Sequence, residues 1–114
     1  MKSTIIAFLT VLCFIGGTGC SEDPPAVRVR NDYTKKANCQ FKPSAGSTFN
    51  INDVEPGTAT GFQEVPETTY DVTATIQGSN ATPTARFKAE NDYRYTVVVT
   101  NNEPPTLRVD SEER

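Results

Sequence analysis

The chain has 114 residues, of which 36% are hydrophobic and 22% charged, and its formal net charge is -3 at pH 7. This length predicts one domain, and the negative balance argues against a nucleic-acid binder, which needs a basic surface. Because the chain contains no histidine, chemistry that needs an imidazole base or an imidazole metal ligand is excluded.

The first residues have the three parts of a secretory signal peptide. Lys2 supplies a positive charge, residues 5–15 form an apolar run, and small residues follow at positions 16–19. The apolar run is shorter than the about 20 residues that a membrane-spanning helix needs. We therefore expect an exported protein whose leader, residues 1–19, is removed.

The end of this leader reads Gly17-Thr18-Gly19-Cys20, with Gly17 at the position where a lipobox usually has leucine. It resembles the lipobox of bacterial lipoproteins. The resemblance implies that the Cys20 sulfur is acylated and that Cys20 becomes the new N-terminus. Stable anchoring needs more than one acyl chain, and the diacyl or triacyl modification of this class meets that need.

Ser21 in the second mature position is, by analogy with enterobacterial sorting, a signal for the outer membrane. We therefore expect a lipid-anchored protein of the cell envelope, in the outer membrane, at its periplasmic face or at the cell surface. Residues 20–26 are polar and rich in proline, which predicts a tether between the bilayer and the domain.

The interpretation of the cysteines depends on this anchor. If Cys20 carries lipid, Cys39 is the only thiol left in the mature chain. The alternative is a plain secretory signal, and a disulfide between Cys20 and Cys39 is then possible in an oxidising compartment. Cys39 alternates with Phe41 around a polar residue, which predicts a small buried side chain on a strand rather than a nucleophile.

From residue 27 onward apolar and polar residues alternate, as in strands with one face on a core and the other in water. The alternating runs lie at residues 27–30, 39–42, 49–52, 61–64, 70–77, 85–89, 93–100 and 107–110. Turn-forming residues separate the runs, and no window has the apolar spacing of a helix. The sequence therefore predicts an all-β domain over residues 27–110, a small antiparallel sandwich of seven or eight strands, with a frayed tail at residues 111–114.

The apolar members of these runs form the predicted core. They are Val27, Val29, Phe41, Phe49, Ile51, Phe62, Tyr70, Val72, Ile76, Phe87, Tyr95, Val97, Val99 and Leu107. Val98 breaks the alternation, and we expect it to lie on the outer face.

Four segments follow each other in the order of a known family: residues 27–31 (VRVRN), 55–62 (EPGTATGF), 65–72 (VPETTYDV) and 93–99 (YRYTVVV). This order resembles the secreted bacterial domain of unknown function 4397. The resemblance implies a sandwich of the transthyretin or immunoglobulin kind at the cell surface, and it supplies no catalytic residues.

Acidic residues are the only candidates for acid–base or metal chemistry. Asp53 and Glu55 lie beside Asn50 and Asn52, and such oxygen ligands suit Ca²⁺. Their spacing matches no EF-hand loop, so solvated turn residues are the simpler interpretation. We expect no metal and no cofactor.

Glu64, Glu67 and Asp71 are candidates for the paired carboxylates of a glycan hydrolase. Nothing local fixes the separation that such a pair requires, and a domain of this size rarely encloses a sugar cleft. We therefore predict that the protein is not an enzyme.

Tyr33, Phe62 and Tyr93 are candidates for an aromatic ligand face that would bind a sugar or a peptide. Aromatic residues at alternate positions are more often core, but Tyr33 lies in a polar loop. Basic residues occupy outward strand positions, where cross-strand pairing with acidic residues is expected. They are Arg28, Arg30, Arg86, Lys88, Arg94 and Arg108.

Together these patterns predict a membrane-anchored envelope lipoprotein that presents a small β-sandwich in a structural or binding role. Its expected partners are the membrane, through the lipid, and an envelope protein or a glycan, which loops or an exposed strand edge would hold. Two alternatives remain open: a carboxylate-dependent glycan hydrolase of the envelope, and an assembly subunit of an envelope complex.

Overall fold

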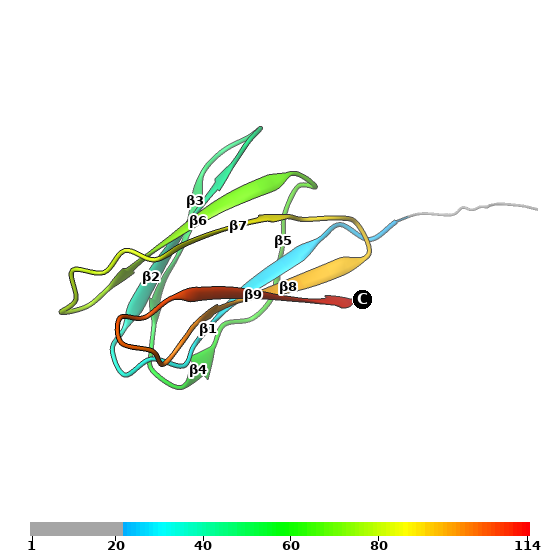
Figure 1. Ribbon diagram of the computed structural model, residues 1–114. Helices are drawn as coiled ribbons and strands as arrows, with labels where there is room; N and C mark the ends of the chain where they lie inside the picture. Colours follow the sequence, from blue (N-terminus) through cyan, green and yellow to red (C-terminus); the bar gives the residue numbers. More distant parts are fainter. Residues whose placement is uncertain (1–21) are drawn as a thin grey trace, which may run out of the picture.

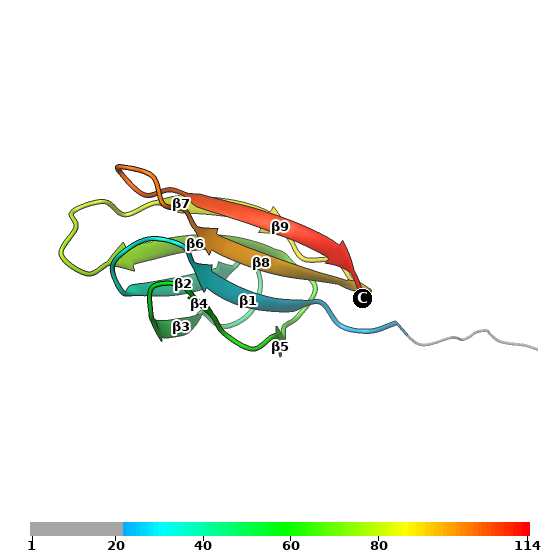
Figure 2. The same ribbon diagram turned by 90° about the horizontal axis from the view of Figure 1, so that it is seen from below.

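The computed structural model describes residues 22–114, and both the predicted signal peptide and Cys20 lie outside them. This part of the chain contains no helix, and its nine strands form two packed sheets (Figures 1 and 2). The all-β sandwich predicted from the alternation is therefore confirmed. Among the same residues, no helix has the length and apolarity to cross a membrane.

The first sheet has the strand order β4-β1-β8-β9, and β5 also pairs with β1. Its strands are β1 (Ala26–Asn31), β4 (Thr58–Ala59), β5 (Gln63–Glu64), β8 (Tyr93–Val99) and β9 (Leu107–Glu113). The second sheet has the order β3-β2-β6-β7. Its strands are β2 (Ala37–Pro43), β3 (Phe49–Val54), β6 (Thr69–Ile76) and β7 (Thr84–Lys88).

One strand pair departs from the predicted antiparallel arrangement. β1 and β8 run parallel, with Ala26 beside Arg94 and Asn31 beside Val99. Parallel neighbours need a long connection between them. Here that connection contains all four strands of the second sheet as well as the short edge strands β4 and β5.

Aromatic rings fill much of the space between the sheets. Phe41 of β2 stacks on Phe49 of β3, with ring centroids 4.9 Å apart, and Tyr70 of β6 meets Phe41 edge-on at 6.4 Å. Phe87 of β7 and Tyr95 of β8, 5.0 Å apart, connect the two sheets. Such aromatic pairs add stabilisation beyond the area that they bury.

All residues of the predicted core except Phe62 lie in this core or pack against it. Val98 lies on the outer face, as expected, and is nevertheless fully buried. Further residues that are not in the predicted core complete it, namely Tyr33, Ala37, Val54, Val65, Ala74 and Ala89.

The prediction of a frayed tail at residues 111–114 is wrong. β9 continues to Glu113, which lies opposite Tyr93, and the Arg114 backbone N–H donates to the Asp92 carbonyl at 2.9 Å. These residues are polar because they form an edge strand. They are ordered because they pair with β8. Local composition cannot reveal this pairing, because the partner residues lie elsewhere in the sequence.

The predicted tether extends too far into the chain. Pro25 is fully buried, and its carbonyl accepts a hydrogen bond from the Val65 N–H at 2.9 Å. Ala26 is 2% exposed and begins β1. The fold therefore starts before residue 27, at Asp23, which exchanges two hydrogen bonds with Asp92.

Candidate functional site

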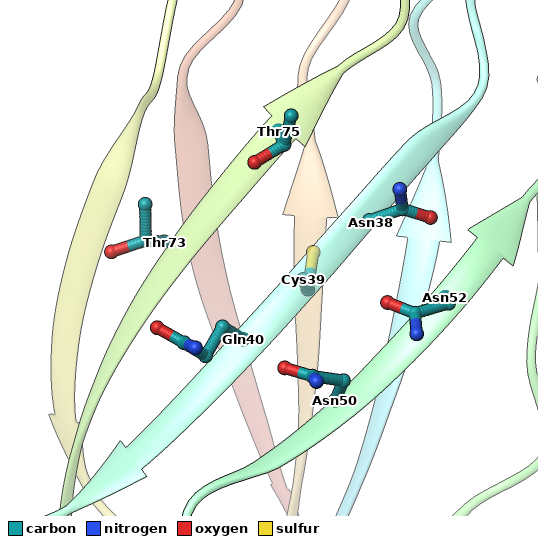
Figure 3. Close-up of a pocket in the computed structure, with 7 residues that line it drawn as sticks. All are labelled: Asn38, Cys39, Gln40, Asn50, Asn52, Thr73 and Thr75. Carbon is teal, nitrogen blue, oxygen red and sulfur yellow. The ribbon is translucent and has the colours of Figure 1, made fainter.

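The outer face of the second sheet carries a depression of about 260 Å³. Polar, uncharged side chains from three adjacent strands line it (Figure 3). We call them the amide–hydroxyl face: Asn38 and Gln40 of β2, Asn50 and Asn52 of β3, and Thr73 and Thr75 of β6. Cys39 lies at the floor, but its side chain belongs to the core on the other side of the sheet.

Strand register places these side chains in two rows. Gln40 lies opposite both Asn50 and Thr73, so one row crosses three strands. Asn38 lies opposite Thr75 in the next row. Neighbouring strands are about 4.8 Å apart, and residues i and i+2 are about 7 Å apart along a strand. The result is a grid of hydrogen-bonding groups on one surface.

The side chains of this face are largely unengaged. Within residues 22–114 only Asn38 makes a side-chain hydrogen bond, in which its Oδ1 accepts from the Asp53 N–H at 2.7 Å. Asp53 has a φ of 60°, and this bond holds the strained end of β3 against β2. The other five side chains make no hydrogen bond within the described residues, so water or a ligand must satisfy them.

Charged residues flank the amide–hydroxyl face on two sides, as one balanced pair and as one group with a net charge of -1. On one side the Arg86 Nε donates to Asp71 Oδ1 at 2.7 Å, and this contact lowers the pKa of the Asp71 carboxyl. On the other side the Lys36 ammonium lies 3.8 Å from Asp53 and 3.6 Å from Glu55. The charges lie at the borders, and the residues that line the depression are uncharged.

The amide–hydroxyl face lies away from the point where the chain joins the fold. Asn31, at the end of β1, donates to the carbonyls of Lys35 and Val54 at 2.7 and 2.9 Å, which ties this end of the first sheet to β2 and β3. Asp23 lies at the opposite end of β1, against Asp92. We refer to these as the Asn31 end and the Asp23 end of the sandwich. Figure 1 shows the two ends of β1 on opposite sides of the molecule.

The outer face of the first sheet has a different chemistry. The guanidinium carbons of Arg28 and Arg94 lie 4.5 and 5.0 Å from the centroid of the Phe62 ring. Arg28 Nε donates to the Thr96 hydroxyl at 3.0 Å, and an Arg94 amino group donates to Glu112 at 2.9 Å. Among the described residues, the Arg94 Nε is the one buried side-chain nitrogen or oxygen without a hydrogen-bond partner.

The assignment of Phe62 to the core is therefore wrong. Its ring is half-buried beneath two arginines on the outer face, where cation–π attraction offsets its exposure. The alternation around it continues only into the two-residue strand β5, which is too short to fix which face a side chain takes.

The remaining arginines of this sheet pair with acidic residues of their own strand or of the loop that follows. Arg30 contacts Asp32 at 3.1 Å, and Arg108 contacts Asp110 at 3.0 Å, which lowers the pKa of Asp110. Val98 lies between Arg30 and Arg108 in the ladder. We call the surface formed by Arg28, Arg30, Arg94 and Arg108 the arginine face.

The predicted cross-strand pairing is confirmed for Arg86 with Asp71 and for Arg94 with Glu112. Arg30 and Arg108 instead pair with residues two positions further along the chain.

The three aromatic residues predicted as a ligand face do not share one surface. Tyr33 is buried at the Asn31 end, and its hydroxyl donates to Glu103 at 2.9 Å, which raises the pKa of Tyr33. Tyr93 packs against the core at the Asp23 end. Phe62 lies on the arginine face.

The acidic candidates are engaged separately. Glu64 contacts Arg114 at 3.6 Å, Glu67 accepts from the Asn91 N–H at 3.1 Å, and Asp71 pairs with Arg86. The Asp53 and Glu55 pair faces Lys36. Within residues 22–114, no three acidic, cysteine or histidine residues come together as a metal site would require.

Cys39 is a buried core residue, as predicted. It is 1% exposed, and burial raises the pKa of its thiol to about 12. A thiol with this pKa is protonated at neutral pH and is a poor nucleophile. The predicted lipidation site, Cys20, lies outside the described residues.

Comparison with protein-family models finds no match to this chain, and comparison with curated proteins finds none either. The resemblances to the lipobox and to the domain of unknown function 4397 therefore stay predictions.

The amide–hydroxyl face is not among the predicted sites, although the sequence contains a signal for it. Asn, Gln and Thr occupy alternate outward positions in three separate runs, at residues 38–40, 50–52 and 73–75. Three uncharged polar runs in one chain are the feature to look for. Their convergence becomes visible only once the order of the strands is known.

Proposed function

We propose that this chain is an envelope lipoprotein that presents a small β-sandwich as a binding module beside the membrane. The observation that carries the binding role is the amide–hydroxyl face, an open depression whose donors and acceptors are mostly unused within the described residues. The leader and the lipobox-like end at Cys20 support the anchor.

The start of the fold sets the distance between anchor and domain. Asp23 already belongs to the fold, and it lies three residues after Cys20. An extended chain spans at most about 3.6 Å per residue, so this connection reaches roughly 10 Å. A lipid on Cys20 would hold the sandwich close to the bilayer, with the Asp23 end nearest to it and the amide–hydroxyl face further out.

Metabolic labelling with a fatty-acid analogue tests the anchor. We expect the wild-type chain to carry the label and to fractionate with membranes, and Cys20→Ala to lose both properties. Cys39→Ala is the matched control, because it removes the other cysteine of the mature chain and should keep the label. An unlabelled wild-type chain contradicts the proposal.

A further inference from the structure

We infer that the amide–hydroxyl face binds a neutral glycan chain. This inference rests on the binding role proposed above and specifies the class of ligand. Three features support this ligand: the chemistry of the lining side chains, the absence of charged residues from the lining, and the shape of the surface.

The lining groups match the hydrogen-bonding chemistry of sugars. Each amide side chain offers two N–H donors and a carbonyl acceptor, and each threonine hydroxyl both donates and accepts. Gln40, Asn50 and Thr73 form one row across three strands, and none of them has a partner within residues 22–114. A ligand that presents many hydroxyl groups can satisfy such a row, with or without bridging waters.

The charge distribution selects a neutral ligand. No charged residue lines the depression. At its borders Asp71 is paired with Arg86, and Lys36 lies between Asp53 and Glu55. Unpaired charge lies only outside the lining: Asp53 and Glu55 outnumber Lys36 by one, and Lys42, two residues beyond Gln40, has no ion pair within residues 22–114. A charged polymer would therefore give up its hydration over the lining groups without gaining an ion pair there.

The surface suits an oligosaccharide better than a protein. Protein partners draw most of their binding energy from aromatic, arginine and large apolar anchors, and the amide–hydroxyl face has none of these. The exposed edge at β3 is a poor template for an added peptide strand, because Asp53 has a positive φ and the register with β2 shifts between Ala37 and Cys39. Without an aromatic platform, binding at one site should be weak, and avidity on a polymer should compensate.

Sedimentation with insoluble polysaccharides tests the inference. The probes are cellulose, amylose and chitin as neutral polymers, and crosslinked pectate as an anionic one. The full chain, extracted from membranes in mild detergent, should sediment with at least one neutral polymer and not with pectate. Short oligosaccharides cut from that neutral polymer should release it.

Variants locate the site. Gln40→Ala, Asn50→Ala and Thr73→Val should each weaken sedimentation about 3- to 10-fold, as expected for loss of one hydrogen bond. Thr73→Val keeps the shape of the threonine side chain while it removes the hydroxyl. Lys42→Ala is the matched control on the same strand and the same face, and we expect it to change binding by less than about twofold. A thermal unfolding curve for each variant confirms that these exposed substitutions leave the fold intact.

Several results would overturn the inference. They are the absence of binding to all three neutral polymers, equal binding to pectate, and undiminished binding by all three site variants. The Cys20→Ala chain separates this inference from the anchor, because glycan binding does not need the lipid. Retained sedimentation by a wild-type chain that takes up no fatty acid would overturn the anchor alone, whereas a labelled chain that binds no neutral polymer would overturn the glycan site alone.

Discussion

The outer faces of the two sheets carry different side chains, and these side chains differ in how many hydrogen bonds and ion pairs they make. On the arginine face, guanidinium groups bond to Thr96, Asp32, Asp110 and Glu112, and two of them also cover Phe62. On the amide–hydroxyl face, five of the six side chains have no partner within residues 22–114. The same fold thus presents one surface whose groups, apart from the Arg94 Nε, are bonded, and one whose groups, apart from Asn38, have no partner within the described residues.

This difference predicts that the two faces contribute differently to stability and to binding. Groups that satisfy each other hold strands together, and the arginine face also covers apolar surface at Phe62 and Val98. Groups bonded only to water add little to stability, because unfolding leaves them equally hydrated. Substitutions on the arginine face should therefore affect folding, and substitutions on the amide–hydroxyl face should affect binding.

The largest expected effect concerns the core that both faces share. Phe41→Ala removes a fully buried ring that contacts Phe49 and Tyr70, so the free energy of unfolding should fall by about 3–5 kcal/mol. Urea denaturation measures this loss, with Lys42→Ala as the exposed neighbour for comparison. A loss below about 1 kcal/mol would mean that the two faces do not depend on one core.

A direct comparison of the two faces should give the next largest effect. Phe62→Ala removes a half-buried ring and its contacts with Arg28 and Arg94, and we expect a loss of about 1–2 kcal/mol. The triple variant of Gln40, Asn50 and Thr73 to alanine should stay within about 0.5 kcal/mol of the wild type, as surface substitutions usually do. Equal losses in urea denaturation would remove the distinction between the faces.

The buried thiol beneath the amide–hydroxyl face gives an alkaline pH dependence. The pKa of Cys39 is about 12 in the fold, against an ordinary value of 9.0. The unfolded thiol therefore loses its proton first, and the stability that the protonated thiol contributes is lost as pH rises above about 9. The loss should reach on the order of 1 kcal/mol by pH 10.

Burial also raises the pKa values of Tyr70 and Tyr95, so these tyrosines act in the same direction as Cys39. Urea midpoints measured between pH 7 and pH 11 for the wild type and for Cys39→Ala separate the contribution of the thiol. If the urea midpoints of the wild type and Cys39→Ala fall equally with rising pH, burial does not raise the pKa of the Cys39 thiol.

The smallest effect is expected in acid. Arg86 lowers the pKa of Asp71, and Arg108 lowers that of Asp110. Each pair contributes stability that is present above the ordinary carboxyl pKa of 3.8 and is lost as pH falls through the lower folded value. Both carboxylates are exposed to water and salt, so the change should be slight. Urea midpoints at pH 5 and pH 2.5 for the wild type, Asp71→Asn and Asp110→Asn measure it, and a large drop specific to one pair would contradict this view of the surface.

Alternation along the sequence was enough to predict the strands and most of the core, because residues such as Val27, Val29, Phe41 and Val97 repeat with the period of a half-buried strand. It could not predict pairing between distant segments. The parallel neighbours β1 and β8, the ordered end of β9 and the outward position of Phe62 all depend on contacts between residues far apart in the chain.

The candidate site shows the same limit. Gln40 and Thr73 are each unremarkable outward residues of an alternating run, and the row that they form with Asn50 exists only through the order β3-β2-β6. The aromatic ligand face is predicted from residue type and, for Tyr33, from its polar neighbours in the sequence. Tyr33 has a polar neighbourhood in the sequence, yet it packs in the core cluster. Its hydroxyl bonds to Glu103 in the loop after β8, the strand beside β1.

The bonds around Arg114 have a practical consequence for how this protein is handled. Its guanidinium donates to the Pro24 carbonyl at 2.5 Å and its backbone N–H bonds to Asp92, so the last described residue lies beside the first ones. If Cys20 is lipidated as proposed, a fluorescent reporter fused after Arg114 would crowd the same side as that lipid. The loop at residues 77–83, which follows β6 at the Asn31 end, offers a position for an inserted epitope that antibodies could reach from the aqueous side.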